Sequence, residues 1–216
     1  MQTREEKEYW ERLSWGSTLS EDFIRKFSDK VHWRFICEFQ LLSEDFIREF
    51  QDKVDWRVVS CYQKLSEGFI EEFSDKVYWP YISSHQSLSE NFIRKHINLI
   101  YWREISWRQN LSEEFIIEFQ SKVHWHNISV YQNLSEDFIR KFQNKVSWLA
   151  ISQYRDFSLH FVEEFLEKLD LKELIMNCNL CQSTKEYIRT NFGSEVDPNN
   201  LQVLLEKNRI KHKRVV

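Results

Sequence analysis

Glycine and proline are scarce in this chain, with 3 Gly and 2 Pro among 216 residues. That is too few for a β-sandwich or β-barrel, whose frequent turns depend on these residues. It also disfavours a doubly wound α/β enzyme, which needs glycine-rich loops to hold phosphate groups. The composition therefore favours an all-α protein.

Long hydrophobic runs and targeting signals are absent as well. No stretch of about 18 apolar residues occurs, so we expect no membrane-spanning helix and no membrane partner. The first residues, MQTREEKEYWERL, have neither the apolar core of a signal peptide nor the acid-poor character of a transit peptide. We expect a cytoplasmic protein whose four cysteines stay reduced, since four are too few for a disulfide framework in a chain of this length.

The sequence also lacks the usual catalytic and metal-binding motifs, including GxSxG, the P-loop and HExxH. Cys178-Asn-Leu-Cys181 is a lone CxxC without the second ligand pair of a zinc site. It also lacks the strand-and-helix setting of a redox motif, so we interpret it as two half-buried thiols in a terminal cap. His124 and His126 point to different sides of a helix. We therefore predict no enzymatic activity, no metal and no cofactor.

What is abundant is aromatic side chains, 16% of the chain, arranged in a tandem repeat. The tripeptide Leu-Ser-Glu recurs every 23 residues, beginning at Leu19, Leu42, Leu65, Leu88, Leu111 and Leu134. The consensus is L-S-E-x-F-I-x-x-F-x-x-K-V-x-W-x-x-I-S-x-Y-Q-x, numbered here as repeat positions 1 to 23. A fixed period of this length is typical of stacked helical repeats.

Each repeat reads as a pair of short helices. The Ser at position 2 is a natural N-cap, and the acidic residues after it complement the helix dipole. In the first repeat, Phe23, Ile24 and Phe27 form one apolar stripe, a break follows at 28–30, and a second helix carries Trp33 and Ile36. Such short helices are unstable alone, so we expect the Phe and Trp side chains of each repeat to be buried against the next. The small Ser at position 19 lets the helices approach closely.

The sequence thus predicts a right-handed-type solenoid of about seven two-helix repeats with helical caps. Residues 1–18 form an N-terminal cap, 19–156 the six regular repeats, and 157–208 a degenerate seventh repeat with a C-terminal helical cap. Within this cap we expect one long helix over 158–177, a helix over 183–191 ended by Gly193, and a last helix from Asp197-Pro198. A small separate recognition domain is an alternative for this region. Residues 209–216 are a basic tail.

The signature LSEDFIRKF…KVxWRxIS…YQ resembles the short tandem helical repeats of uncharacterised proteins from large DNA viruses and some phages. The likeness covers about two-thirds of the chain. It implies an α-helical repeat protein without catalytic residues, whose partner would be a host factor or a virion component.

The columns that vary between repeats predict where a partner binds. Positions 14, 17 and 21 share one face of the second helix and hold Tyr, His and Arg, which are common in interfaces. The alternative is that these side chains are packed into the next repeat. The partner-binding residues that we predict are His32, Phe35, Asp55, Tyr62, Tyr78, Tyr81, Tyr101, Glu104, Arg108, His124, Asn127 and Tyr131.

Nucleic-acid binding is the alternative function. Arginines recur at positions 7 and 16, as in proteins that read one base per repeat. These are Arg25, Arg48, Arg94 and Arg140, and Arg34, Arg57 and Arg103. However, acidic and apolar residues interrupt both columns and the net charge is −4, so a solvated face is the more favoured interpretation.

The basic tail, with five positive residues in the last ten, suits nuclear import or a weak phosphate contact. A structural role as a virion or assembly spacer is a third function that we consider. Because the repeats are so similar, they could also stack between chains and form a homodimer through the end repeats.

Overall fold

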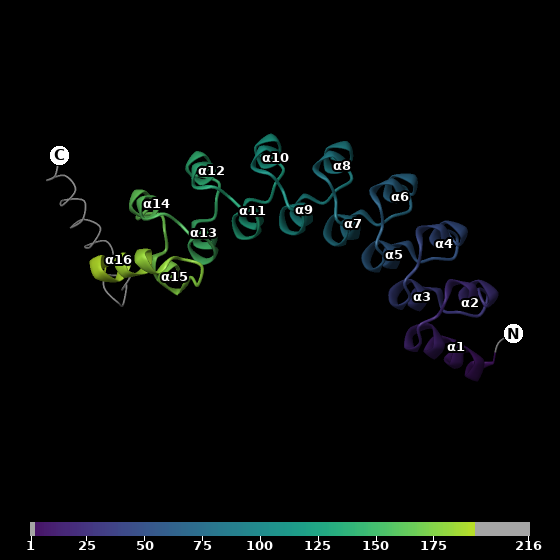
Figure 1. Ribbon diagram of the computed structural model, residues 1–216. Coiled ribbons are helices and arrows are strands. Elements are labelled where there is room, and N and C mark those ends of the chain that lie inside the picture. Colours follow the sequence, from purple (N-terminus) through teal and green to yellow (C-terminus); the bar gives the residue numbers. More distant parts are fainter. Residues whose placement is uncertain (1–2, 193–216) are drawn as a thin grey trace. The chain divides into compact units, whose positions relative to one another are not determined.

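The computed structural model describes residues 3–192, which contain sixteen helices and no strand. The predicted all-α repeat solenoid is confirmed (Figure 1). The predicted last helix from Asp197-Pro198 and the basic tail lie outside the described residues. An N-terminal helix, α1 (Arg4–Gly16), precedes seven helix pairs, and α16 (Gln182–Phe192) follows them.

The first helices of the pairs are α2 (Glu21–Lys26), α4 (Glu44–Glu49), α6 (Glu67–Glu72), α8 (Glu90–Lys95), α10 (Glu113–Glu118), α12 (Glu136–Lys141) and α14 (Leu159–Glu164). The second helices are α3 (Trp33–Phe39), α5 (Trp56–Tyr62), α7 (Trp79–His85), α9 (Trp102–Arg108), α11 (Trp125–Tyr131), α13 (Trp148–Tyr154) and α15 (Leu171–Met176).

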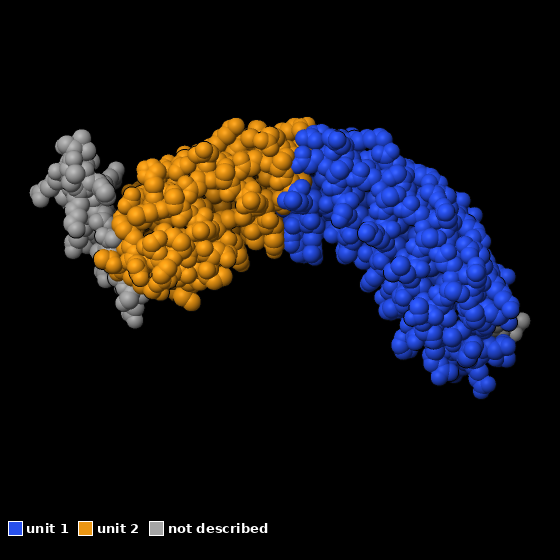
Figure 2. Space-filling model, viewed as in Figure 1, with its two compact units in different colours: residues 1–110 blue, residues 111–216 orange. Residues whose placement is uncertain are grey.

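The chain divides into two compact units, residues 1–110 (unit 1) and 111–216 (unit 2), coloured separately in Figure 2. In unit 1, α1, α3, α5, α7 and α9 pack one against the next along the row. In unit 2, α11, α13 and α15 pack in the same way, and α16 packs on α15. The second helices thus form a closely packed row in each unit, and the first helices form another row beside it (Figure 1).

Local capping sets where the first helices begin. In every pair the Ser at position 2 accepts a hydrogen bond from the backbone N–H three residues later, as from Phe46 to Ser43 at 3.2 Å. This satisfies one of the free N–H groups of the first turn. The predicted N-cap role of this serine is confirmed in the described repeats.

Aromatic packing joins one repeat to the next. The Trp56 ring lies 6.1 Å from Phe69 and 4.8 Å from Phe73, both in the following repeat. The Trp56 indole N–H donates to the carbonyl of Gln51 at 2.9 Å, which fixes the ring orientation. Equivalent rings meet at Trp33, Trp125 and Trp148. This stacking is the predicted source of stability, because each short helix buries its apolar face only against its neighbours.

The seventh pair corrects one prediction. We expected a single long helix over 158–177, whereas the chain forms α14 and α15, separated by a turn as in the other repeats. The cause is local, since the Asp170 carboxylate accepts the backbone N–H of Glu173 at 3.1 Å and begins a new helix. The predicted helix over 183–191 matches α16 to within a residue at each end.

Candidate functional site

Position 14 residues are N-caps of the second helices. The backbone N–H of Tyr78 donates to Ser60 Oγ, and that of Tyr101 donates to Ser83 Oγ, both at 2.9 Å. These serines occupy position 19 of the preceding repeat, so they bond across repeats as well as allowing close approach. The tyrosine rings themselves are exposed. Anchored backbones with exposed rings are suited to contacts with a partner.

Position 17 was predicted to be part of the exposed binding face, but its side chains are buried or half-buried. Val58, Asn127 and Ala150 are buried, and Phe35, Tyr81 and Glu104 are half-buried. Asn127 was predicted to bind a partner, but its side chain is not on the surface. The close packing of successive second helices is the physical reason, because this position faces the next helix of the row.

Position 21 is the most exposed of the three columns. Phe39, Tyr62, Tyr131 and Tyr154 each expose half or more of their surface, and His85 and Arg108 are exposed too. We call these six residues the helix-end column. Our predicted binding set contained Tyr62, Arg108 and Tyr131 from this column and omitted Phe39, His85 and Tyr154. Exposed large aromatic residues in a regular series are unusual, because folding normally buries them.

Two grooves border this column in unit 1. One, of about 500 Å³, is lined by charged and aromatic residues of three second helices, among them Arg34, Glu38, Arg57, Tyr62 and Tyr81. The other, of about 570 Å³, is mainly apolar and lies between the ends of α3 and α5, beside Phe39, Leu42 and Tyr62. Leu41, on its edge, is 97% exposed. The two grooves share Glu38 and Tyr62, so polar and apolar contacts are available side by side.

Arg57, in the lining of the first groove, lies against two tyrosine rings. Its guanidinium lies 4.9 Å from the ring centre of Tyr78 and 5.5 Å from that of Tyr81. A hydrogen bond with Tyr81, followed by electrostatic interactions with Tyr81 and Tyr78, raises the pKa of this guanidinium. Cation–π contacts of this kind hold both rings in place.

The position 7 arginines are already engaged between repeats. Arg25 pairs with Glu49 at 2.7 Å, Arg48 with Glu72 at 2.8 Å, and Arg140 with Glu164 at 2.7 Å. Each also lies over a phenylalanine ring of the next repeat, Phe46, Phe69 and Phe161 respectively. Arg94 pairs with Glu90 within its own helix at 3.6 Å. The column therefore connects repeats, and much of its charge is compensated by acidic residues.

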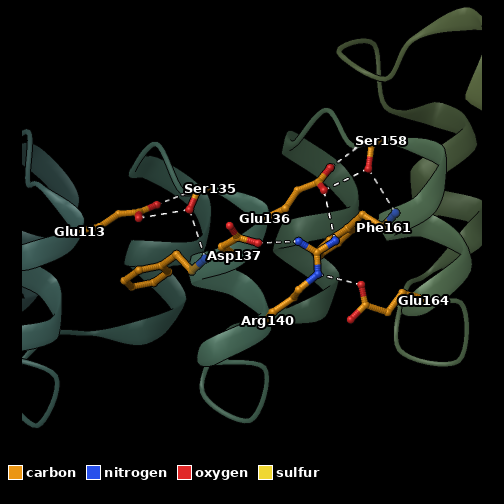
Figure 3. Close-up of polar contacts among 9 residues, drawn as sticks. Glu113, Ser135, Glu136, Asp137, Arg140, Ser158, Phe161 and Glu164 are labelled. Carbon is orange, nitrogen blue, oxygen red and sulfur yellow. Dashed lines mark hydrogen bonds and ion pairs between the residues drawn. The ribbon is translucent and has the colours of Figure 1, made fainter.

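Figure 3 shows this network in unit 2, together with a capping contact that sequence reasoning did not foresee. Glu136 Oε1 accepts the backbone N–H of Ser158 in the next repeat at 2.7 Å, and Glu113 does the same for Ser135 at 2.5 Å. Glu44 and Glu67 make the same contact in unit 1. The recurrent Glu at position 3 thus binds the N-cap serine of the following repeat, in addition to complementing the dipole of its own helix.

The glutamine at position 22 forms a second connection that the sequence reading missed. The Gln86 side-chain amide donates to the carbonyls of Ser60 and Gln63 at 3.0 and 2.8 Å. Its oxygen accepts the N–H of Leu65 at 3.0 Å. Gln40, Gln63 and Gln109 bond in the same way, and all are buried. The available signal was the glutamine that recurs at position 22 in the first five repeats, because a buried amide must be hydrogen-bonded.

The cysteine pair lies at the turn between α15 and α16, and both thiols are exposed. Our interpretation as half-buried thiols was therefore wrong. Asn177 is the buried residue of this turn, and its amide donates to the carbonyls of Ser152 and Arg155. With the amide turned inward, the thiols that follow lie at the surface.

The described part of the chain brings no three His, Cys, Asp or Glu side chains together in a metal-binding cluster. None of its helices has the length and apolar character to cross a bilayer. Comparisons of the sequence and the structure with protein-family models, curated proteins and solved structures gave no match.

Proposed function

We propose that this protein is a non-enzymatic scaffold that binds a protein partner through the exposed ends of its second helices. The observation that carries this proposal is the helix-end column, with one exposed side chain per repeat at the same position. Its members contribute little to the core, so their aromatic character is better explained by an interface than by packing. Aromatic residues and arginine are also the types that dominate binding energy at interfaces.

The grooves of unit 1 support the same proposal. Tyr62 borders both, and Leu41 and Phe39 add exposed apolar surface at the edge of one. Glu38 and Arg34 line the other and provide charges of both signs. A protein segment with apolar and charged side chains suits this mixture better than a polyanion does.

Nucleic-acid binding receives less support from the same surface. The guanidinium groups of Arg25, Arg48 and Arg140 pair with carboxylates, which reduces the positive charge available to phosphates. Arg34 and Arg57 share their groove with Glu38 and Asp55. A groove that tracks a phosphate backbone would be strongly basic.

The test uses variants of the helix-end column with a matched control. One variant carries Phe39→Ser and Tyr62→Ser in unit 1, and a second carries Tyr131→Ser and Tyr154→Ser in unit 2. The control carries Leu99→Ser and Leu159→Ser, which remove exposed apolar surface outside the second helices. All three are compared with the wild-type protein for folding by circular dichroism and for nuclease-treated affinity capture read by mass spectrometry.

We expect one stoichiometric protein that is captured by the wild type and the control and lost from at least one column variant. Its affinity should change little between about 50 and 200 mM salt, whereas a phosphate-centred contact would weaken steeply. A partner that binds all variants equally contradicts the proposal. If nuclease treatment abolishes capture, the result would favour nucleic-acid binding through the arginine columns. If no partner is captured in repeated experiments, the result would favour the structural spacer role.

A further inference from the structure

The four cysteines of this protein lie in very different surroundings, and two of them form an exposed pair. Cys37 is fully buried, and burial raises the pKa of its thiol to about 12. Cys61 is half-buried, and burial raises its pKa as well. Cys178 and Cys181 are exposed. Reactivity of a thiol requires access and a population of thiolate, so the pair is the reactive site of the described chain.

Cys181 is placed at the start of α16 with donors around its sulfur. Its Sγ lies 3.1 Å from Ser183 Oγ and 3.0 Å from Thr184 Oγ1. Hydrogen bonds from these two hydroxyls, and then from the Thr184 backbone N–H, lower the pKa of the Cys181 thiol. The first turn of a helix adds a positive potential that also favours the thiolate.

Cys178 stands three residues before it, on the other side of a turn. The chain turns at 178–179 and bends at 180 before α16 begins. A disulfide needs a Cα separation of about 4.4–6.8 Å, whereas a fully extended chain would place residues three apart at about 10 Å. The turn and the bend shorten the path between the two cysteines toward the separation that a disulfide needs.

Hydrogen bonds from three residues fix this turn to the preceding repeat. The Cys181 backbone N–H donates to Asp156 Oδ1 at 3.2 Å, and the Asn179 amide donates to the Tyr154 carbonyl at 3.1 Å. The Asn177 amide is bonded to the carbonyls of Ser152 and Arg155. The backbone is thus held while both thiols remain accessible.

We propose that Cys178 and Cys181 form a reversible dithiol–disulfide site that exchanges with small disulfides such as oxidised glutathione. The proposal is independent of the partner-binding function. It assigns the first attack to Cys181 and the resolving role to Cys178.

The exchange proceeds in two balanced steps. The Cys181 thiolate attacks one sulfur of oxidised glutathione, which forms a mixed disulfide and releases one glutathione thiolate that takes up a proton. The Cys178 thiolate then attacks the Cys181 sulfur and releases the second glutathione. The two cysteines lose two electrons and two protons in total, and oxidised glutathione gains them.

The test equilibrates the full-length protein in mixtures of reduced and oxidised glutathione, followed by acid quenching, alkylation and peptide mass spectrometry. In the wild type we expect a disulfide between Cys178 and Cys181 that reduced glutathione reverses. Cys178→Ser should accumulate a mixed disulfide on Cys181, because the resolving thiol is missing. Cys181→Ser should lose the reaction, and its fold should persist because serine is a favourable N-cap.

Two further measurements separate this site from general thiol exposure. Cys61→Ser should leave the exchange unchanged. The alkylation rate of Cys181 near neutral pH should exceed that of Cys61 by on the order of tenfold for each unit of pKa difference. Replacing Ser183 and Thr184 by Ala and Val should move the midpoint of the Cys181 alkylation profile to higher pH.

Three results would overturn the proposal. They are equal alkylation of Cys61 and Cys181, disulfide-linked dimers in place of the internal disulfide, and no disulfide at any glutathione ratio.

Discussion

The carboxylate of Glu71 and the ammonium of Lys95 lie 2.7 Å apart in an ion pair whose polarity is the reverse of its equivalents. In the first, second and sixth repeats the position 7 residue is an arginine that pairs with a glutamate of the next repeat, as Arg48 does with Glu72. Here the glutamate is at position 7, and position 8 of the next repeat holds the basic residue Lys95 in place of a glutamate. Charge complementarity between neighbours is therefore kept although the individual residues are exchanged.

This relationship predicts a double-mutant cycle. Glu71→Arg and Lys95→Glu, each made alone, should lower the denaturant midpoint, because each places like charges opposite one another. The double variant should recover most of the loss, since it restores the arginine–glutamate order of the other repeats. Equal, additive losses in urea unfolding would show that the pair contributes no coupling. The effect should shrink at high salt because both groups are solvent-accessible.

We predict a larger effect on stability when a glutamine at position 22 is replaced. Gln86→Leu should lower the free energy of unfolding by roughly 2–4 kcal/mol, because it leaves the buried carbonyls of Ser60 and Gln63 and the N–H of Leu65 without their amide partner. Chemical denaturation gives this difference. The control is Ser87→Leu at the next, exposed position, which should change stability by less than about 0.5 kcal/mol. Similar values for the two variants would mean that the amide is dispensable.

Arg155 occupies the glutamine position of the sixth repeat and is a poor substitute for it. Its guanidinium donates to the carbonyls of Ser129 and Gln132, and within the described chain its Nε is buried without a hydrogen-bond partner. Desolvation lowers the pKa of the group. A guanidinium also has no acceptor for the N–H of Leu134.

Arg155→Gln should therefore raise the free energy of unfolding by roughly 0.5–2 kcal/mol, since it supplies both donor and acceptor without burying a charge. Arg155→Leu, which removes the donors without replacing them, should lower it. Thermal and urea unfolding of the two variants test the idea. A loss of stability in the glutamine variant would show that the longer arginine side chain is needed at this repeat.

We predict that the buried Cys37 makes the free energy of unfolding depend on pH in the alkaline range. It takes the place of the position 19 serine, and burial raises its pKa to about 12. The unfolded thiol ionises near pH 8.5, so the folded state holds its proton more tightly than the unfolded state does. The stability that this protonated thiol contributes is complete below about pH 8.5 and is lost progressively as the pH rises toward 12.

The free energy of unfolding of the wild type should thus fall relative to that of Cys37→Ser between about pH 8.5 and 10, by up to roughly 1.4 kcal/mol per pH unit. Serine is the matched replacement, because the other repeats carry it there. Parallel pH profiles for the two proteins would contradict the predicted burial of the thiol.

The amino-acid sequence by itself determined the repeat length, the paired helices and their N-terminal caps. These features are local, because they depend on residues that are close in the chain. The serine cap accepts the N–H of the residue three positions later, and the apolar stripe lies on adjacent turns of one helix. For the same reason the sequence placed Trp33 and Phe46 in the core interfaces, where their rings lie 6.2 Å apart.

Only the tertiary structure decided how the repeats are joined and which variable residues remain exposed. Gln86 and Glu136 act on the neighbouring repeat, so their roles depend on distances across repeats and not on sequence spacing within one. Asn127 and Tyr131 belong to the same predicted face, yet one is buried and the other exposed. The packing of successive second helices separates them, because it covers position 17 and leaves position 21 at the free end of the helix.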